Sequence, residues 1–299
     1  MPVSVIIPNY NAAPYLAQCL ASVASDPAVS EIVIYDNDST DDSLAVIDTL
    51  GIAKVRLIQG QENQGATMGR HLAVQASRTD LLFFLDADDF VSDYAVSGAA
   101  SVLAQNNLGL SLFEERRVNE DGSITEWFIP APEQVVDGET AFKMSVPSWR
   151  IHPRGVLRRT VYEAAASRFK FHGYSDDELL TRCILLDAGR VAGGGGVYYY
   201  RVVPKSASRE MLVGRLQTQL GVLGLTSELA NDEPLSREQR NRVTRMLLGL
   251  LRRTVTADAR MEDVRVLFSE FDKFKMRWTL RDLPFFLATQ LVRLAVARR

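Results

Sequence analysis

Three aspartates that follow an apolar run form the strongest candidate for chemistry in this sequence. Asp86, Asp88 and Asp89 come directly after Leu81–Leu85, which reads as a buried strand. Carboxylates grouped at the end of a buried strand are costly unless something neutralises their charge. Divalent hard cations do so, because they bind carboxylate oxygen together with substrate phosphate. The alternative interpretation is an acidic turn that caps the next helix.

Two further polar segments follow strand-like runs. Asp36, after Glu31–Tyr35, is an acidic residue of the kind that accepts hydrogen bonds from a base or a ribose hydroxyl; the alternative is a helix N-cap. The segment Asn63–Arg70 contains Gly65 and Gly69, which permit close approach of the backbone to a ligand. The N-terminus of the helix that follows the glycines favours an anion, and Arg70 is placed to reach a phosphate. Neither the phosphate-binding loop of nucleotide hydrolases nor the dinucleotide fingerprint is present.

Alternation of strands and helices predicts the framework that positions these residues. Four strands are expected, at Val3–Ile7, Glu31–Tyr35, Val55–Gln59 and Leu81–Leu85. Helices are expected between them, including Ser43–Leu50, with Asp41 or Asp42 as N-cap, and Thr67–Ser77. This order predicts an α/β fold whose mainly parallel sheet has helices on both faces and binds ligands beyond the carboxyl ends of its strands.

The pattern changes along the second half of the chain. Strands are expected at Leu110–Phe113, Ile124–Ile129 and Val197–Val202, with a helix at Asp177–Leu186 and a flexible turn at Gly193–Gly196. Beyond Met211 the pattern is almost wholly helical. We therefore expect a catalytic domain over 1–208, made of halves 1–105 and 106–208, and a helical C-terminal region over 209–299.

Composition excludes several classes of protein. The 299 residues are 46% hydrophobic and 24% charged, as in an ordinary globular protein. Two cysteines and three histidines exclude a disulfide framework and a His-rich metal site. A net charge of −3 does not favour nucleic acid as a partner. No secretory signal or spanning helix is recognised, so a cytoplasmic location is expected.

Charge is unevenly distributed along the chain. Residues 211–299 carry 16 Lys or Arg and 10 Asp or Glu, although the whole chain is acidic. Apolar residues from Leu283 to Val296, with arginines beside them, fit a helix that lies on an anionic membrane surface. The alternative is a helix packed on the catalytic domain or on a second copy of the chain.

Taken in order, these motifs resemble the N-terminal half of family 2 glycosyltransferases, which have the GT-A fold. The resemblance rests on Val3–Asn11, the Asp-rich segment at Asp36, the Asn-x-Gly-x-x-x-x-Arg turn and the Asp-x-Asp motif at Asp86–Asp88, and it runs from residue 3 to 91. It implies a nucleotide-diphosphate-sugar donor and a Mn²⁺ or Mg²⁺ ion bound by Asp88. The residues that it implies for the donor are Pro8, Tyr10, Asn11, Asp36, Asn37, Arg70, Asp86 and Ala87. Asn37 stands where many relatives have a second Asp, which leaves both a UDP- and a dTDP-sugar open.

The acceptor side is also implied by resemblance. Asp176 aligns with the family's catalytic base when Leu179 and Arg182 are matched to its Glu-Asp-x-Glu-Leu-x-x-Arg segment, and Asp177 is the second candidate. A carboxylate at a helix start can remove the proton of an attacking hydroxyl, although acids at that place also simply favour the helix N-terminus. Further acceptor-side candidates are Trp149, His152 and Arg201.

The resulting hypothesis is an inverting, metal-dependent glycosyltransferase. It would move a sugar to a hydroxyl of a glycan, free or lipid-linked, in surface polysaccharide synthesis. Contact with the inner face of the membrane and homo-oligomers are left open. The competing hypotheses are a nucleotidyltransferase and a non-catalytic scaffold that binds nucleotides or glycans. The first would need a Gly-rich basic loop after the first strand, where this chain has Pro8-Asn9-Tyr10-Asn11.

Overall fold

The computed structural model describes residues 1–145, 149–168 and 176–203 of the chain. The predicted helical region 209–299 and its predicted membrane contact lie outside the described residues. Within the described part, no helix has both the length and the apolar character needed to cross a bilayer.

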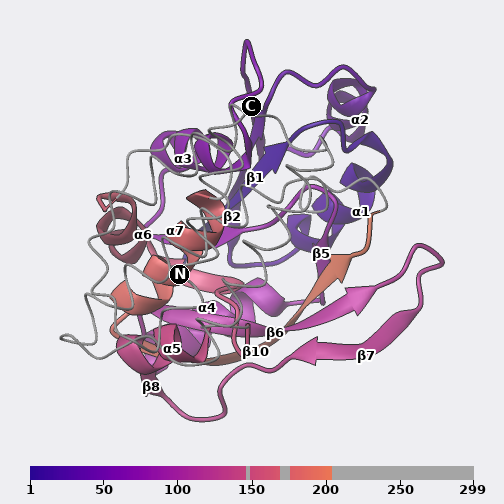
Figure 1. Ribbon diagram of the computed structural model, residues 1–299. Helices are drawn as coiled ribbons and strands as arrows, with labels where there is room; N and C mark the ends of the chain where they lie inside the picture. Colours follow the sequence, from indigo (N-terminus) through magenta and orange to yellow (C-terminus); the bar gives the residue numbers. More distant parts are fainter. Residues whose placement is uncertain (146–148, 169–175, 204–299) are drawn as a thin grey trace, which may run out of the picture. The chain divides into compact units, whose positions relative to one another are not determined.

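One mixed sheet organises the described residues (Figure 1). Its main path runs β3-β2-β1-β4-β9-β6-β10-β5; β7 pairs with β6, and β8 pairs with β10. Strands β1 to β4 pair in parallel, and β9 runs antiparallel to both β4 and β6. The strands are β1 (Val3–Asn9), β2 (Val29–Asp36), β3 (Val55–Gln59), β4 (Leu81–Phe84), β5 (Phe90–Val91), β6 (Leu110–Val118), β7 (Ile124–Ile129), β8 (Val136–Asp137), β9 (Gly155–Arg158) and β10 (Arg190–Arg201).

Helices cover both faces of the sheet. Figure 1 shows α3, α6 and α7 on one side and α1 and α2 on the other. The helices are α1 (Ala13–Ala24), α2 (Ser43–Leu50), α3 (Ala66–Ala76), α4 (Ala95–Gln105), α5 (Gly138–Met144), α6 (Arg159–Ala166) and α7 (Asp176–Asp187). The α/β fold class predicted from the alternating pattern is therefore confirmed. Asp42 is the N-cap residue of α2 but makes no capping hydrogen bond with its side chain, whereas Asp41 Oδ1 accepts one from Ser43 N.

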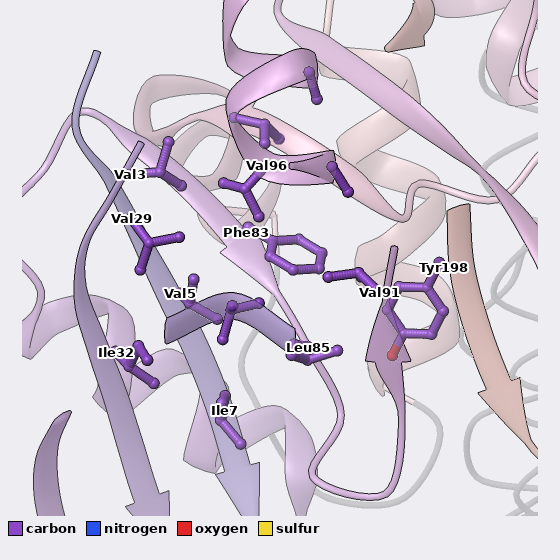
Figure 2. Packing of buried hydrophobic residues seen from close by; sticks show 14 of the residues in the cluster. Val3, Val5, Ile7, Val29, Ile32, Phe83, Leu85, Val91, Val96 and Tyr198 are labelled. Carbon is purple, nitrogen blue, oxygen red and sulfur yellow. The ribbon is translucent and has the colours of Figure 1, made fainter. Parts of the chain in front are cut away.

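A continuous apolar core joins the sheet to α1, α2 and α4. Alternate residues of β1, such as Val5 and Ile7, are fully buried against Leu16 and Leu20 of α1. Figure 2 shows these strands with Phe83 and Leu85 beside them and Tyr198 next to Val91. The packing holds the carboxyl ends of β1, β2 and β4 in fixed relation, because all three strands share this core.

The run Gly193–Gly196 is not the flexible turn that the sequence predicts: it lies inside β10. Here α4 packs directly on the strand. A Cβ built at Gly194 would lie 2.5 Å from Ser111 Oγ and 2.8 Å from Ala99 Cβ. Glycine is therefore needed for close packing, and a register shift between Gly193 and Val197 accommodates the run.

Gly194→Ala is expected to destabilise the fold by about 2 kcal/mol, because overpacking a tight interface forces backbone or side chains to shift. Gly98→Ala is the matched control. Gly98 lies in α4 across the same interface, and an added Cβ meets only Gly194 O, at 3.5 Å. We expect this control to be neutral or stabilising by up to about 1 kcal/mol. Urea unfolding measures both, and equal effects of the two substitutions would contradict the packing argument.

Candidate functional site

The carboxyl ends of β1, β2 and β4 bring the predicted site residues to one edge of the sheet. Asn9 ends β1 opposite Asp36, which ends β2. Leu85, just beyond β4, donates from its backbone N to Ile6 O at 3.0 Å, which keeps the acidic segment Asp86–Asp89 beside the end of β1. Parallel pairing thus gathers three segments that are far apart in sequence.

Asp36 lies beneath the surface rather than at it. It is 2% exposed, and its carboxylate accepts hydrogen bonds from Asn9 Nδ2 at 2.6 Å and from Ser39 N and Oγ at 3.0 and 2.6 Å. Asn37 is equally buried, with its side-chain nitrogen against Gly69 of α3. Asp36 and Asn37 therefore support this edge from the interior of the protein. Little hydrogen-bonding capacity of Asp36 is left for a ligand, because the protein itself already uses most of it.

The residues at the end of β1 differ in exposure. Pro8 is buried, whereas Tyr10 is 49% exposed. Asn11 is exposed and its Oδ1 accepts from Thr40 N at 2.8 Å, which joins the loops after β1 and β2. Tyr10 therefore presents the free aromatic surface at this edge.

A cavity of about 560 Å³ lies next to Asp36, at the ends of β2 and β3. Its lining contains no lysine or arginine, so it suits an uncharged polar group better than a phosphate. The residues that line it are Tyr35, Gln59, Gly60, Gln61, Glu62 and Gln64.

Asp86 is held by two arginines. Arg70 of α3 contacts its Oδ1, and Arg154 Nη1 lies 3.0 Å from its Oδ2. Burial disfavours the charge of Asp86, but the two arginines outweigh it and hold the pKa of that carboxyl well below its usual range. Asp86 is thus a permanent anion whose two oxygens are both engaged by the protein.

Asp88 has the opposite environment. Among the described residues, no other side chain forms a hydrogen bond or ion pair with its carboxylate. Burial, and then the nearby charge of Asp86, raise the pKa of Asp88 to about 6. A cation here would relieve both effects, so the residues present fit the Mn²⁺ or Mg²⁺ that the motif implies.

The protein supplies few ligands for such an ion. Across the residues that the structure describes, no group of three or more His, Cys, Asp or Glu side chains is arranged to hold a metal. Mg²⁺ is commonly bound by one or two carboxylates and completed by substrate phosphate and water. A single available carboxylate at Asp88, next to Ala87, which is buried, matches that manner of binding.

Asp89 is the anchored end of the acidic segment. It is 1% exposed and accepts from Tyr198 Oη and from Arg201 N, both at 2.7 Å. Burial raises the pKa of Asp89, although Arg154 opposes the rise. Arg201 also donates from Nε to Asp88 O at 2.8 Å and from Nη2 to Gln18 Oε1 at 2.6 Å. This acceptor-side candidate therefore lies against α1 and the backbone of the acidic segment.

Two other acceptor-side candidates lie together on the far side of Arg154. The ring of Trp149 meets His152 edge-on, with the centroids 4.5 Å apart, and the Arg182 guanidinium lies 3.8 Å from the Trp149 centroid. His152 Nδ1 is 2.9 Å from Glu115 Oε2, and the same oxygen lies 2.9 Å from Arg154 Nε. Contacts through Glu115 and Arg154 thus connect His152 to Asp86.

The first residues of α7 include both candidate bases. Asp176 begins this helix, and Asp177, the next residue, is exposed. Burial disfavours the charge of Arg70, but Asp86 and then Asp177 outweigh it and raise the pKa of Arg70. Asp177 is therefore close enough to Arg70 to act on it electrostatically.

Arg154, Glu115 and Tyr198 belong to this network but are not among the site residues predicted from the sequence. Arg154 is half-buried, forms ion pairs with Asp86 and Glu115, and lies 4.0 Å over the ring centroid of Tyr198. The one sequence signal for it is its place at the start of an apolar strand, because a buried arginine needs acidic partners. Which acids these are depends on contacts between distant segments.

Glu115 gives a testable pH dependence of stability. Burial would raise its pKa, but His152 and Arg154 outweigh burial and lower the pKa to about 2. A carboxyl whose pKa is depressed by folding stabilises the native state above its unfolded pKa, and this contribution is lost as the pH falls toward the folded value. Glu115→Gln is therefore expected to cost about 3 kcal/mol at pH 7, and the difference from wild type should shrink steadily between pH 5 and about 2. Urea unfolding of both proteins at several pH values measures it; a pH-independent difference would contradict the ion-pair account.

Comparisons with known proteins show the family to which this sequence is related. The family model described as Glycosyl transferase family 2 matches residues 4–159. The succinoglycan biosynthesis protein ExoU of Rhizobium meliloti is 37% identical over 90 residues, which cover 29% of this chain and 26% of ExoU. The poly(ribitol-phosphate) beta-N-acetylglucosaminyltransferase TarS of Staphylococcus aureus is 26% identical over 211 residues, which cover 67% of this chain and 35% of TarS. The chain spans less than half of the length of these curated relatives.

Solved structures of S. aureus TarS share the fold. The complex with UDP-GlcNAc superposes with a TM-score of 0.61 at 19% identity and covers 99% of this chain and 82% of that chain. The complex with UDP has a TM-score of 0.59 at 21% identity and covers 99% and 81%. The predicted GT-A fold is confirmed by this likeness.

Proposed function

The chain belongs to glycosyl transferase family 2, and from that premise we propose that it is an inverting glycosyltransferase that uses a nucleotide-diphosphate-sugar donor. The observation that carries the proposal is the contrast within the acidic segment. Asp86 and Asp89 are fully engaged by the protein, whereas Asp88 between them has no side-chain partner among the described residues. An unpaired, half-buried carboxylate at the carboxyl edge of the sheet is suited to a cation that carries a diphosphate.

Donor binding follows from the elements around Asp88. We propose that the nucleoside lies along the ends of β1, β2 and β3, with Tyr10 on its exposed side and the polar cavity near Gln59 as the place of the base. TarS, whose structures hold UDP and UDP-GlcNAc, supports a uridine nucleotide as the first candidate. A dTDP-sugar is the second.

In the reaction, the acceptor hydroxyl loses its proton to Asp176 as its oxygen attacks the anomeric carbon. The bond from that carbon to the diphosphate oxygen breaks, and the electron pair leaves with the nucleoside diphosphate. A bound Mn²⁺ or Mg²⁺ supplies charge stabilisation for this leaving group. Arg70, which is held by Asp86, adds a fixed positive charge near the same place. One displacement needs no second nucleophile, so the configuration at the anomeric carbon inverts.

The acceptor is proposed to be a hydroxyl-rich surface polymer or its lipid-linked precursor. The names of ExoU and TarS, which refer to succinoglycan biosynthesis and to poly(ribitol phosphate), support this class. Trp149 and His152 are the residues that we propose for contact with it, because an aromatic ring next to a polar ring suits a sugar or polyol.

The experiment is a panel of UDP- and dTDP-sugars with Mn²⁺, read first by thermal unfolding and then by product. A ligand that binds the native state raises the melting temperature, which identifies the donor. With that donor and a polyol or glycan acceptor, release of UDP or dTDP that depends on the acceptor supports the proposal. Release of inorganic pyrophosphate from a nucleoside triphosphate and a sugar phosphate, supplied in a separate reaction, would instead support a nucleotidyltransferase, and binding without any turnover would support a scaffold.

A further inference from the structure

We infer that Tyr198 is a positioning residue whose hydroxyl fixes the turn from Asp86 to Asp89, so that Asp88 is held ready for the cation and the donor diphosphate. This inference rests on the proposed function. It concerns a residue of β10, more than a hundred positions from the acidic segment along the chain.

The hydroxyl of Tyr198 ties both ends of the turn. It accepts a hydrogen bond from Asp86 N at 3.2 Å and donates one to Asp89 Oδ2 at 2.7 Å. Tyr198 is fully buried, so water does not replace either partner. Because a phenol has one proton to donate, this arrangement gives the donated bond to Asp89 and leaves the oxygen to accept from Asp86.

The backbone of the turn is closed around the same point. Asp89 N donates to Asp86 O at 3.0 Å, and Arg201 holds Asp89 Oδ1 and Asp88 O through its backbone N and its Nε. Within the described part of the chain, the Asp88 carboxylate is the one acidic group of the turn that these contacts leave available. The contacts therefore fix where Asp88 projects without using its oxygens.

The ring of Tyr198 is held independently of its hydroxyl. The Arg154 guanidinium lies 4.0 Å from the ring centroid, and Phe83 meets the ring edge-on at 6.4 Å. Figure 2 shows the ring beside Val91, next to the apolar core. Tyr198→Phe keeps these ring contacts and removes only the hydroxyl, so it isolates the proposed role.

Loss of the hydroxyl leaves a buried backbone N–H without an acceptor and removes the hydrogen bond to Asp89 Oδ2, which then keeps, among the described residues, only Arg154 Nη1, 3.7 Å away. Unpaired buried groups are unfavourable, and the turn can relieve them only by moving. Movement of the turn displaces Asp88 from the geometry that a cation and diphosphate require. We expect weaker cation binding, with the fold retained.

The test compares Tyr198→Phe with wild type and with Tyr199→Phe, the same substitution one residue further along. Tyr199 stacks on Phe90, with the centroids 4.7 Å apart, and is not part of the site. Binding of Mn²⁺ at saturating UDP is measured by the loss of the free-ion electron paramagnetic resonance signal, and melting temperatures are measured without metal. We expect Mn²⁺ affinity about 10-fold weaker in Tyr198→Phe and within 2-fold of wild type in Tyr199→Phe. Wild-type affinity in Tyr198→Phe would overturn the inference, whereas failure of wild type to bind Mn²⁺ with UDP would overturn the proposed function itself.

A second variant keeps the test decisive if Tyr198→Phe unfolds. Asp89→Asn breaks the same hydrogen bond at its acceptor when the amide nitrogen faces the Tyr198 hydroxyl, because an amide nitrogen cannot accept a hydrogen bond from that hydroxyl. Its Mn²⁺ affinity should also fall by about 10-fold. Where both single variants fold, the double variant should lose less Mn²⁺ affinity than the product of the two single losses. The reason is that the hydrogen bond between Tyr198 and Asp89 can be broken only once. Independent, multiplicative losses, or wild-type affinity in Asp89→Asn, would overturn the inference.

Discussion

Asp88→Asn is expected to lower kcat/KM for the donor by about 10³-fold and to abolish the dependence of the reaction on Mn²⁺. The reason is that Asp88 is the carboxylate of the acidic segment that the described residues leave without a side-chain partner. An amide at this place keeps the shape of the side chain but not its charge. Steady-state kinetics over a range of Mn²⁺ concentrations measure the effect.

The melting temperature of Asp88→Asn separates a functional role of Asp88 from a structural one. Burial and the charge of Asp86 disfavour an ionised Asp88, so its replacement by a neutral amide should leave the melting temperature of the metal-free protein unchanged or higher. Asp93→Asn is the matched control, because Asp93 is an exposed acid that follows β5. Loss of activity in both variants, or unfolding of Asp88→Asn, would contradict the assignment.

Asp176→Asn is expected to lower kcat by about 10³-fold while the affinity for UDP stays within 2-fold of wild type. A base acts on the acceptor hydroxyl in the transition state, so its removal affects turnover and not the binding of the nucleotide. Asp176 starts α7, and its neighbour Asp177 acts electrostatically on Arg70, which contacts Asp86. Single-turnover kinetics with isothermal calorimetry of UDP separate the two quantities.

Asp177→Asn is the informative comparison. Asp177 is exposed and acts on Arg70, so its replacement should cost less than about 10-fold in kcat. If Asp177→Asn instead produced the large loss and Asp176→Asn the small one, the base would be Asp177. If neither variant changed kcat, neither acid would be the base.

The parallel half of the fold is predictable from the sequence because each of its elements carries a local signal. Ser43–Leu50 and Val55–Gln59 are found at the residues predicted for them, as is the antiparallel strand Ile124–Ile129 outside this half. The rule that parallel strands present ligand-binding residues at their carboxyl ends also brings Asp36 and Asp86 to one edge, as expected.

The remainder depends on contacts that no local pattern encodes. Gly193–Gly196 is wrongly predicted as a turn because glycine disfavours strands, whereas here close packing of α4 on β10 requires it. Arg154 and Tyr198 reach the acidic segment across 68 and 112 positions of sequence, so only the folded chain reveals them. The same is true of the burial of Asp36, whose place at a strand end predicts a residue open to ligand.

Calorimetric titration of UDP into the wild-type protein, with Mn²⁺ and then with a chelator, tests the central claim most directly. The claim is that Asp88 holds a cation that binds the donor diphosphate. We predict binding with Mn²⁺, and a loss of affinity of at least about 10-fold both with the chelator and in Asp88→Asn. Equal affinity for UDP in all three titrations would contradict it.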